Sequence, residues 1–174
     1  MNSEMLVRAY RPEDLPAVTR LFHDTVHQVN RADYTPEQLA AWAPRKPDFE
    51  HWRAKLSAEE VIVAESGAQI VGFCSWNGAG CLDFLYVHHA HQRQGIASKL
   101  YAAAEAALRR KALAKIHANV SLTAHPFFAR QGFENVRDQN AQVRGVELPN
   151  AMMEKRLDSS DNKSAGRRGR GGRA

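Results

Sequence analysis

Residues 91–100, which read HQRQGIASKL, combine hydrogen-bond donors with a glycine where an apolar run passes into a helical pattern. The apolar run covers residues 81–87, and the helical pattern begins at Ile96. Free backbone N–H groups at the start of a helix, together with the helix dipole, attract anions. Gly95 lets the backbone approach a ligand closely, and the small side chain of Ala97 leaves the helix start open. The pattern predicts a phosphate or pyrophosphate site formed by Gln92, Arg93, Gln94, Gly95, Ile96, Ala97 and Ser98, with Lys99 as a further donor.

The spacing Gln92-x-x-Gly95-x-Ala97 resembles the acetyl-CoA loop of the GNAT superfamily of N-acetyltransferases, which reads Q/R-x-x-G-x-G/A. The flanking segments strengthen the resemblance. Residues 82–87 resemble the family's fourth strand, and residues 96–111 resemble its third helix. Residues 121–133 resemble its short fourth helix with a closing Gly-Phe, and residues 11–15 resemble its common start. The resemblance thus covers about residues 5–157. No G-x-G-x-x-G follows an expected strand and no P-loop lysine motif is present, which excludes those two phosphate-binding folds.

The resemblance implies both a fold and an activity. The fold is a mixed α/β (α+β) architecture, with a mostly antiparallel twisted sheet of six to seven strands and helices on both faces. The activity is transfer of the acetyl group from acetyl-CoA, as co-substrate, to a primary amine by direct attack in a ternary complex. Leu85, Tyr86 and Val87 would pair with the pantetheine arm, and a strand N–H such as that of Tyr86 would polarise the thioester carbonyl. Thr123 and Phe128 complete the residues expected at the cofactor.

One residue departs from the family pattern. Four residues before the closing glycine, the family often has a tyrosine that protonates the leaving thiolate, whereas this chain has Phe128. Because a free thiol has a pKa near 8.5, the thiolate is an acceptable leaving group without an acid. Assistance by water or by a hydroxyl such as that of Ser121 or Thr123 is left open. Phe127 and Phe128 are interpreted as packing residues, one of them against the pantetheine arm.

A carboxylate is expected to take the proton of the acceptor amine, since only the neutral amine attacks and a free lysine has a pKa near 10.4. Asp83 stands in an otherwise apolar central strand, where desolvation would raise the pKa of a carboxyl. Strand alternation puts it on one face with Cys81, Leu85 and Val87, and family bases commonly come from this strand. The alternative is an aspartate bonded to a neighbouring arginine or backbone N–H, and the sequence leaves both open. Glu65 is a weaker candidate.

Two other groups of residues are candidates for a metal site and for the wall of the acceptor pocket. His88, His89 and His91 have no Asp, Glu or Cys close in sequence, which makes a poor ligand set, so we expect a solvated loop and no metal. Tyr34 and Trp42 lie in the segment that forms the acceptor wall in the family. We interpret them as lining that pocket, with simple coverage of the sheet as the alternative.

The elements that position these residues follow from apolar periodicity, turn residues and prolines. The expected strands cover residues 5–10, 61–65, 69–76, 81–87, 116–120, 133–136 and 152–157, and the expected helices cover 15–29, 37–42, 49–56, 96–111 and 126–131. Symmetric pairing across the turn at 77–80 places Trp76 opposite Cys81 and Cys74 opposite Asp83. The two cysteines are then not partners, which predicts two free thiols.

Composition excludes several classes of protein. The chain has 174 residues, of which 44% are hydrophobic and 25% charged, as in an ordinary soluble domain. No apolar run approaches the roughly 18 residues needed to cross a bilayer, and the first residues lack a secretory signal pattern. Two cysteines are too few for a disulfide scaffold or a cysteine-rich zinc domain. We expect a cytoplasmic protein without membrane contact.

Basic residues are concentrated at the end of the chain. Residues 158–174 hold five basic and two acidic residues, and so account for most of the net charge of +5. Their Gly/Arg-rich composition predicts a disordered tail after a folded domain of residues 1–157. Because cationic tails bind nucleic-acid phosphates weakly, an accessory nucleic-acid-binding protein is one alternative function. A CoA-binding protein without turnover, which Phe128 leaves open, is another. The sequence leaves open the amine acceptor and whether the protein forms a homodimer.

Overall fold

The structure, a computed structural model, describes residues 5–157 and contains seven strands. The strands are β1 (Met5–Ala9), β2 (Glu60–Ser66), β3 (Gln69–Trp76), β4 (Leu82–Val87), β5 (Lys115–Ser121), β6 (Glu134–Val143) and β7 (Val146–Arg156). The α-helices are α1 (Leu15–Gln28), α2 (Pro36–Trp42), α3 (Phe49–Ser57), α4 (Ile96–Arg110) and α5 (His125–Arg130). None of the helices in this range is long and apolar enough to cross a membrane. The predicted tail, residues 158–174, lies outside the described residues.

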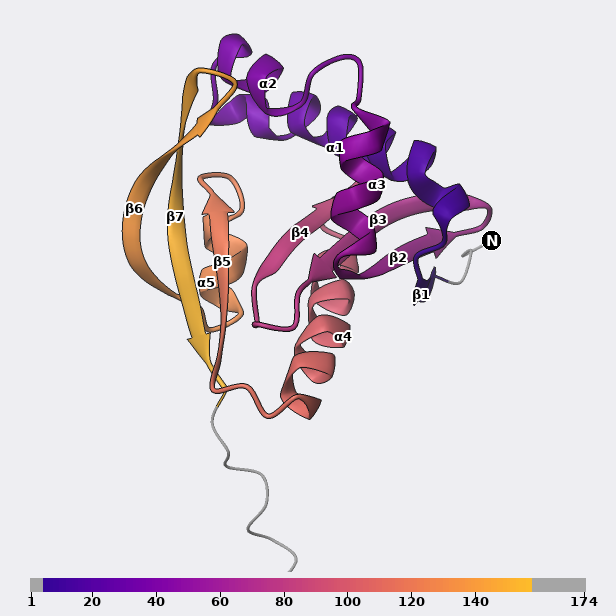
Figure 1. The fold of residues 1–174 in the computed structure, drawn as a ribbon, viewed down its shortest axis with the longest axis vertical. Helices are drawn as coiled ribbons and strands as arrows, with labels where there is room; N and C mark the ends of the chain where they lie inside the picture. Colours follow the sequence, from indigo (N-terminus) through magenta and orange to yellow (C-terminus); the bar gives the residue numbers. More distant parts are fainter. Residues whose placement is uncertain (1–4, 158–174) are drawn as a thin grey trace, which may run out of the picture.

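The strands form two antiparallel sheets with the orders β1-β2-β3-β4 and β5-β7-β6. Within the described range, Cys81, the residue before β4, forms a single parallel bridge with His117 of β5. Beyond this bridge the two strands diverge, which leaves an opening between the two sheets (Figure 1). The predicted fold class, a mixed and mostly antiparallel sheet with helices on both faces, is confirmed. The division into two sheets was not predicted.

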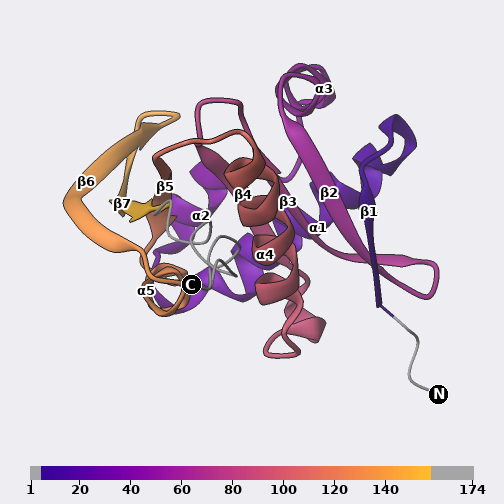
Figure 2. The ribbon, with the colours of Figure 1, turned by 90° about the horizontal axis from the view of Figure 1, so that it is seen from below.

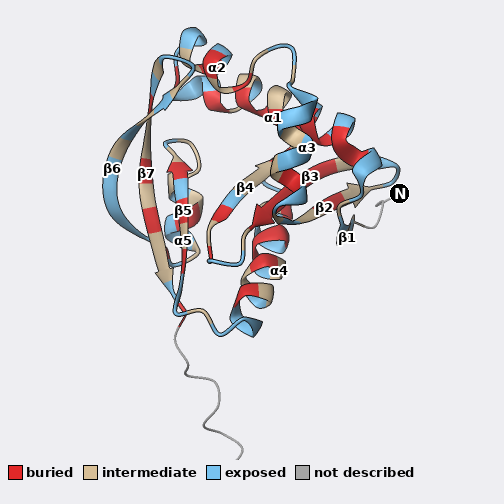
Figure 3. Ribbon diagram, viewed as in Figure 1, coloured by how far each residue is buried: buried red, intermediate tan, exposed pale blue. Residues whose placement is uncertain are grey.

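Helices cover both faces of the four-stranded sheet (Figure 2). On one face, α4 packs its apolar stripe against β3, and Leu100 and Leu108 are fully buried there with Val71. On the other face, α1 buries Val18 and Val26 in a second cluster that includes Phe73. Figure 3 shows the same division, with red stripes on the sides of α1 and α4 that face the sheet. The two cores hold the sheet rigid, and the ends of its strands therefore provide fixed positions for a site.

The hairpin between β3 and β4 contains an irregularity that changes its register. Ser75 pairs with Phe84 and Trp76 with Leu82, so Asp83 has no partner on β3 and forms a bulge. The predicted pairs, Trp76 with Cys81 and Cys74 with Asp83, are wrong. The connecting loop spans 77–81, one residue longer than assumed, and the bulge adds one more, so Cys74 pairs with Leu85. Both cysteines are nevertheless free, as predicted.

The C-terminal hairpin is much longer than the sequence predicted. Instead of short strands at 133–136 and 152–157, β6 and β7 run continuously into a turn at Arg144 and Gly145, whose φ angles are 48° and 76°. Positive φ at both central residues is the geometry that matches the twist of a hairpin. Most of β6 is exposed because it is the edge of its sheet, so its polar sequence carries little apolar alternation.

Candidate functional site

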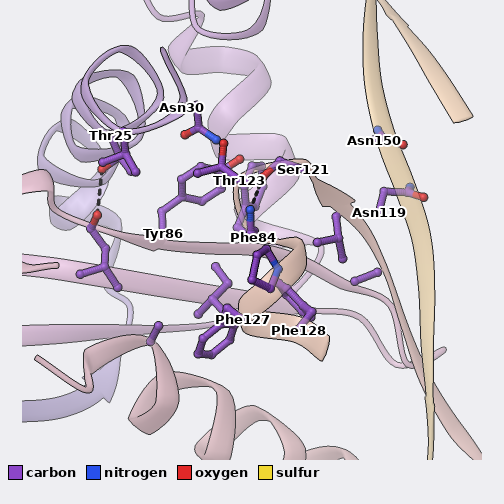
Figure 4. Close-up of a pocket in the computed structure, with 18 of the residues that line it drawn as sticks. Thr25, Asn30, Phe84, Tyr86, Asn119, Ser121, Thr123, Phe127, Phe128 and Asn150 are labelled. Atoms are coloured by element: carbon purple, nitrogen blue, oxygen red, sulfur yellow. Dashed lines mark hydrogen bonds between the residues drawn. The ribbon is translucent and has the colours of Figure 1, made fainter. Parts of the chain in front are cut away.

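A cavity of about 960 Å³ lies where β4 and β5 diverge (Figure 4). Its lining comes from β4, the start of α4 and α5, from the facing strands β5 and β7, and from α1 and the segment around α2. Twelve of the residues that the sequence singled out for the site line it: Asp83, Leu85, Tyr86, Val87, Gln92, Arg93, Gly95, Ile96, Ala97, Ser98, Thr123 and Phe128. Gln94, which is exposed, does not line it, and neither do Lys99 and Glu65.

The loop that enters α4 has the backbone geometry of an anion site. Gly95 is the N-cap of α4 and has a φ of 77°, and Arg93 also has a positive φ, 60°. A Cβ at Gly95 would meet no atom within 4 Å, so the glycine is required for its backbone conformation and the space beside it is open. The first N–H groups of a helix have no intrahelical acceptor. Those of α4 therefore face the cavity as free donors, with the positive end of the helix dipole behind them.

Side chains at the end of β4 hold this loop in place. The carbonyl oxygen of Val87 accepts a hydrogen bond from Gln92 Nε2 at 2.6 Å and another from Thr25 Oγ1 at 3.1 Å. Gln92, expected as a ligand donor, thus uses its amide to tether the loop to β4. The Thr25 contact adds α1 to the same anchor, as the dashed line in Figure 4 shows.

The edge of β4 that faces the opening carries free backbone groups. The N–H of His88 donates to Val71 on β3 at 2.8 Å. Because the direction of backbone groups alternates along a strand, the N–H groups of Leu85 and Val87 face away from β3 into the opening, and that of Tyr86 faces β3. The Tyr86 N–H, which the sequence offered for polarising the thioester carbonyl, is therefore turned toward β3, whereas those of Leu85 and Val87 face the opening, and the group that polarises the carbonyl stays a prediction.

The histidine loop is locally bonded. His88 Nδ1 accepts a hydrogen bond from the Ala90 N–H at 3.1 Å, and its ring lies 4.2 Å from that of His89, centroid to centroid. Burial lowers the pKa of His88, and the neighbouring His89 and His91 lower it further. Between residues 5 and 157, no group of three or more His, Cys, Asp or Glu side chains is arranged to hold a metal ion.

Tyr34 and Trp42 form part of the wall opposite the loop. The Tyr34 hydroxyl donates to the Pro149 carbonyl at 2.6 Å and accepts from the Leu122 N–H at 3.0 Å. Burial raises the pKa of this phenol, and the two bonds use its hydrogen-bonding capacity to join three segments of the chain. Trp42 packs edge-on against Tyr34, with ring centroids 5.2 Å apart. Both residues line the cavity and also pack against the second core cluster, and their contact with an acceptor stays a prediction.

Three carboxamides that line the cavity were not singled out from the sequence. Asn30, Asn119 and Asn150 come from three distant segments and all line it (Figure 4). Asn119 Oδ1 accepts from Gln139 Nε2 at 2.8 Å, whereas the buried Oδ1 of Asn150 has no partner in the described part of the chain. Nothing in the spacing of these three residues indicates that they converge.

Asp83 is placed differently from the sequence expectation. It is exposed, with 31% of its side chain accessible, and its Oδ2 lies 2.6 Å from Lys55 Nζ on α3. The bulge removes Asp83 from the regular alternation of the strand and sets it beside α3, so the expected isolation among apolar side chains is wrong. It lines the cavity all the same, and its role as a base stays a prediction.

Glu59, which the sequence did not single out, shares the same lysine. Only 5% of its side chain is exposed, its Oε1 lies 3.1 Å from Lys55 Nζ, and its Oε2 accepts from Ser75 Oγ at 2.5 Å. Burial raises the pKa of Glu59 against the opposing effects of Ser75 and Lys55. For Lys55, burial lowers the pKa, but the contacts with Asp83 and Glu59 outweigh it and the net pKa is raised. The i,i+4 spacing of Lys55 and Glu59 was the available signal.

Glu65, the weaker candidate, lies in another network. Arg8 Nε donates to its Oε2 at 2.6 Å, and Arg8 Nη1 donates to Asp14 Oδ2 at 2.8 Å. The Arg8 hydrogen bond holds the pKa of Asp14 below its usual range. Glu65 does not line the cavity. The network instead joins β1, β2 and the turn before α1.

The aromatic residues of α5 pack as expected from the sequence. Phe128 is buried and contacts Phe127 and Phe133 edge-on, with ring centroids 5.6 Å and 5.0 Å apart. The Thr123 hydroxyl donates to Asp33 Oδ2 at 2.7 Å, while Ser121 Oγ accepts from the Ala124 N–H at 3.1 Å. Of the two hydroxyls considered as proton donors, Ser121 is the one whose proton is not committed to Asp33.

Comparisons with known proteins agree on one family. A family model described as an acetyltransferase (GNAT) domain matches residues 30–157. An uncharacterized N-acetyltransferase of Escherichia coli (strain K12), YafP, is 33% identical over 147 residues, which cover 84% of this chain and 93% of that protein. A GCN5-related N-acetyltransferase from Rhodopseudomonas palustris superposes with a TM-score of 0.86 at 29% identity, covering 90% of this chain and 98% of the other. PaiA N-acetyltransferase from Thermoplasma acidophilum, solved with coenzyme A, has a similar fold, with a TM-score of 0.70 at 17% identity over 88% and 99% of the chains.

Proposed function

The chain belongs to the GNAT acetyltransferase family, and we propose that it moves the acetyl group of acetyl-CoA to a primary amine by direct attack in a ternary complex. The observation that carries the proposal is the left-handed Gly95 at the N-cap of α4, at the mouth of the cavity between β4 and β5. An anion site and a slot with free strand groups then lie side by side. An elongated phosphate-bearing thioester matches that combination.

Acetyl-CoA would be held mainly by backbone groups. The N–H groups from Gly95 to Ser98 bind the pyrophosphate at the positive end of α4, and Arg93 adds a charge beside them. The free edge of β4 pairs with the amides of pantetheine. A strand N–H of Leu85 or Val87 would polarise the thioester carbonyl as negative charge develops on its oxygen.

Asp83 would take the proton that the ammonium of the acceptor must lose. The neutral amine then attacks the thioester carbon, so that a C–N bond forms and the C–S bond breaks, and the electron pair of that bond stays on sulfur. The new amide nitrogen loses its second proton, and the thiolate gains one through water or Ser121 to leave as the free thiol. Because the ordinary pKa of an alkyl ammonium lies well above neutral pH, the first proton transfer is the step that most needs a base.

One experiment distinguishes acetyl transfer from binding of CoA without turnover. Thiol release from acetyl-CoA is followed over a panel of peptide N-terminal amines, lysine, aminoglycosides and polyamines, with and without protein. Amine-dependent release supports the proposal. A thermal shift with CoA but no release with any amine would leave a CoA-binding protein without turnover.

The nucleic-acid alternative depends on residues 158–174, which lie outside the described residues. Binding of RNA or DNA by the full chain and by a chain ending at 157, over a salt series, measures it directly. We further propose a cytoplasmic location, because the free thiols Cys74 and Cys81 suit a reducing compartment.

A further inference from the structure

Lys55 holds one ammonium between two carboxylates that differ in their access to the cavity. Its Nζ lies 2.6 Å from Asp83 Oδ2 and 3.1 Å from Glu59 Oε1. Asp83 lines the cavity and is partly exposed, whereas Glu59 does not line it and only 5% of its side chain is exposed. The lysine therefore occupies one oxygen of a carboxylate that lines the cavity.

An acceptor amine reaches the site mainly as its ammonium, because its pKa near 10.4 lies well above neutral pH. The same hydrogen-bonding chemistry that attracts Lys55 to Asp83 attracts this second ammonium. Two ammonium groups on one carboxylate repel each other, so binding of the acceptor and retention of Lys55 by Asp83 oppose one another.

Resting on the proposed role of Asp83, we propose that Lys55 is a positioning residue that passes from Asp83 to Glu59 when the acceptor ammonium binds. In the free enzyme Lys55 keeps the Asp83 carboxylate at the mouth of the acceptor site. On binding, the acceptor replaces it, and Lys55 remains paired through Glu59. No net charge is created or stranded in this exchange.

Glu59 is suited to receive the lysine. Its second oxygen is fixed by the Ser75 hydroxyl at 2.5 Å, so the carboxylate stays oriented toward Lys55 whichever partner the lysine prefers. Only 5% of its side chain is exposed, and burial raises its pKa, so the charged form of Glu59 gains from a close ion pair with Lys55. Lys55 is 39% exposed at its side chain, and its flexible stem allows the small displacement required.

The other ionisable groups around this trio do not compete for the ammonium. Tyr86 on β4, Cys81 in the loop before it and Cys74 on β3 have pKa values raised by burial, so all three are neutral at pH 7. The charge balance beside the bulge is therefore set by Lys55, Glu59 and Asp83.

The proposal predicts that KM for the amine changes in opposite directions in two variants of similar side-chain size. Lys55→Met removes the competing ammonium and lowers KM for the amine about two- to fivefold, the range expected for a partly exposed ion pair. Glu59→Gln keeps the bond from Ser75 but removes the second partner of Lys55, and so raises KM for the amine by a similar factor. Lys55→Arg, the matched control, keeps the charge and does not lower KM. KM for acetyl-CoA is unchanged in all three.

A double-variant cycle tests the link between the two residues. In the Lys55→Met background, Glu59→Gln no longer raises KM for the amine, because no lysine remains to be held at Asp83. Three results would overturn the exchange. The effects of the two substitutions on KM for the amine could be additive, KM could fall in neither lysine variant, or KM could rise equally in Lys55→Met and Glu59→Gln. A purely structural role predicts the last pattern together with lowered thermal midpoints.

A binding measurement that needs no turnover separates this proposal from the proposed function. Ethylammonium chloride is titrated into the CoA-bound protein while the Lys55 side-chain methylene signals are followed by NMR, with tetramethylammonium chloride as the control that cannot donate a hydrogen bond. The exchange predicts a saturable shift with ethylammonium, absent in Asp83→Asn. If turnover depends on Asp83 but the Lys55 signals do not shift with ethylammonium, the exchange is overturned while the proposed function stands. A full turnover rate in Asp83→Asn contradicts the base instead.

Discussion

The two walls of the cavity are built in different ways. The wall expected to hold the cofactor comes from one continuous strand, loop and helix, residues 82–110, and its working groups are mostly backbone N–H groups. The opposite wall comes from α1, the segment around α2, and β7, and its working groups are side chains such as Asn30 and Tyr34. Backbone sites depend on local conformation, whereas side-chain sites depend on which distant segments the fold brings together.

Asp83 belongs to β4, but its side chain contacts Lys55 on α3, so we expect Asp83→Asn to affect the chemical step and not the binding of CoA. Asparagine keeps the shape and can still accept a hydrogen bond from Lys55, so the fold and CoA binding should persist. The chemical step should fall by roughly 10²–10⁴, the range for loss of a general base. The measurement is kcat/KM for the amine beside the dissociation constant for CoA on one preparation.

The pH profile provides the control for this variant. The acidic limb of kcat/KM should lose the inflection that belongs to Asp83, because no carboxyl remains to be protonated. A variant that turns over at the normal rate with an unchanged profile would remove Asp83 from the mechanism. A loss of thermal stability with normal turnover per folded molecule would assign it a structural role with Lys55.

Gly95→Glu is expected to weaken the binding of CoA, the property that Asp83→Asn leaves unchanged. Glutamate must adopt a φ near 77° and places a negative charge within a few ångströms of the expected pyrophosphate. Repulsion of roughly 1–3 kcal/mol predicts that CoA binds about ten- to a hundredfold more weakly. Calorimetric titration with CoA measures the effect.

Gly95→Asn is the matched control, because asparagine tolerates the left-handed conformation and carries no charge. It should bind CoA within a few-fold of the wild type. If Gly95→Glu is folded and binds CoA as tightly as Gly95→Asn does, the anion site is not at this turn and the contrast between the two walls fails.

The same contrast explains what the sequence could predict. The donors, glycine and helix start of residues 92–98 are consecutive, so their spacing alone indicates the geometry found. The acceptor side was only partly accessible. Tyr34 was identified, but Asn30 and Asn150 reach the cavity through tertiary packing that no local spacing encodes.

The environment of Asp83 was missed for a related reason. Strand alternation assumes one residue per partner, and the bulge at Asp83 adds an unpaired residue that turns its side chain toward α3. The length of β6 was missed because an exposed edge strand needs no apolar face. In both places the sheet departs from the regular pattern on which periodicity depends.

A smaller effect is expected where the two walls meet at α5. Phe128→Tyr restores the phenol that is frequent at this position in the family. If the thiolate leaves without a side-chain acid, kcat should change only modestly, provided that the new hydroxyl is accommodated between Phe127 and Phe133. Single-turnover rates at saturating acetyl-CoA measure the step. A gain of about a hundredfold, the low end of general-acid effects, would show that the native site lacks a needed donor.

The smallest expected effect concerns two carboxyl groups whose environments shift their pKa values in opposite directions. Arg8 lowers the pKa of Asp14 by hydrogen bonding, whereas burial raises the pKa of Glu59. For Asp14, the stabilisation is present above its ordinary pKa near 3.8 and is lost as pH falls through the lower folded-state value. For Glu59, the protonated form is favoured by folding. Its stabilisation is therefore complete below about 4.5 and is lost as pH rises through the higher folded-state value.

Glu59→Gln and Asp14→Asn should consequently flatten different parts of the curve of unfolding free energy against pH. With Glu59→Gln, the decline in stability that the wild type shows above about pH 4.5 should become shallower, because no buried carboxyl remains to ionise. With Asp14→Asn, the acidic decline should become shallower while stability at neutral pH falls, since the Arg8 pair is lost. Urea unfolding at closely spaced pH values measures both slopes. If Glu59→Gln instead flattens the acidic side, the contacts of Glu59 with Lys55 and Ser75 outweigh burial and hold its folded-state pKa below the ordinary value.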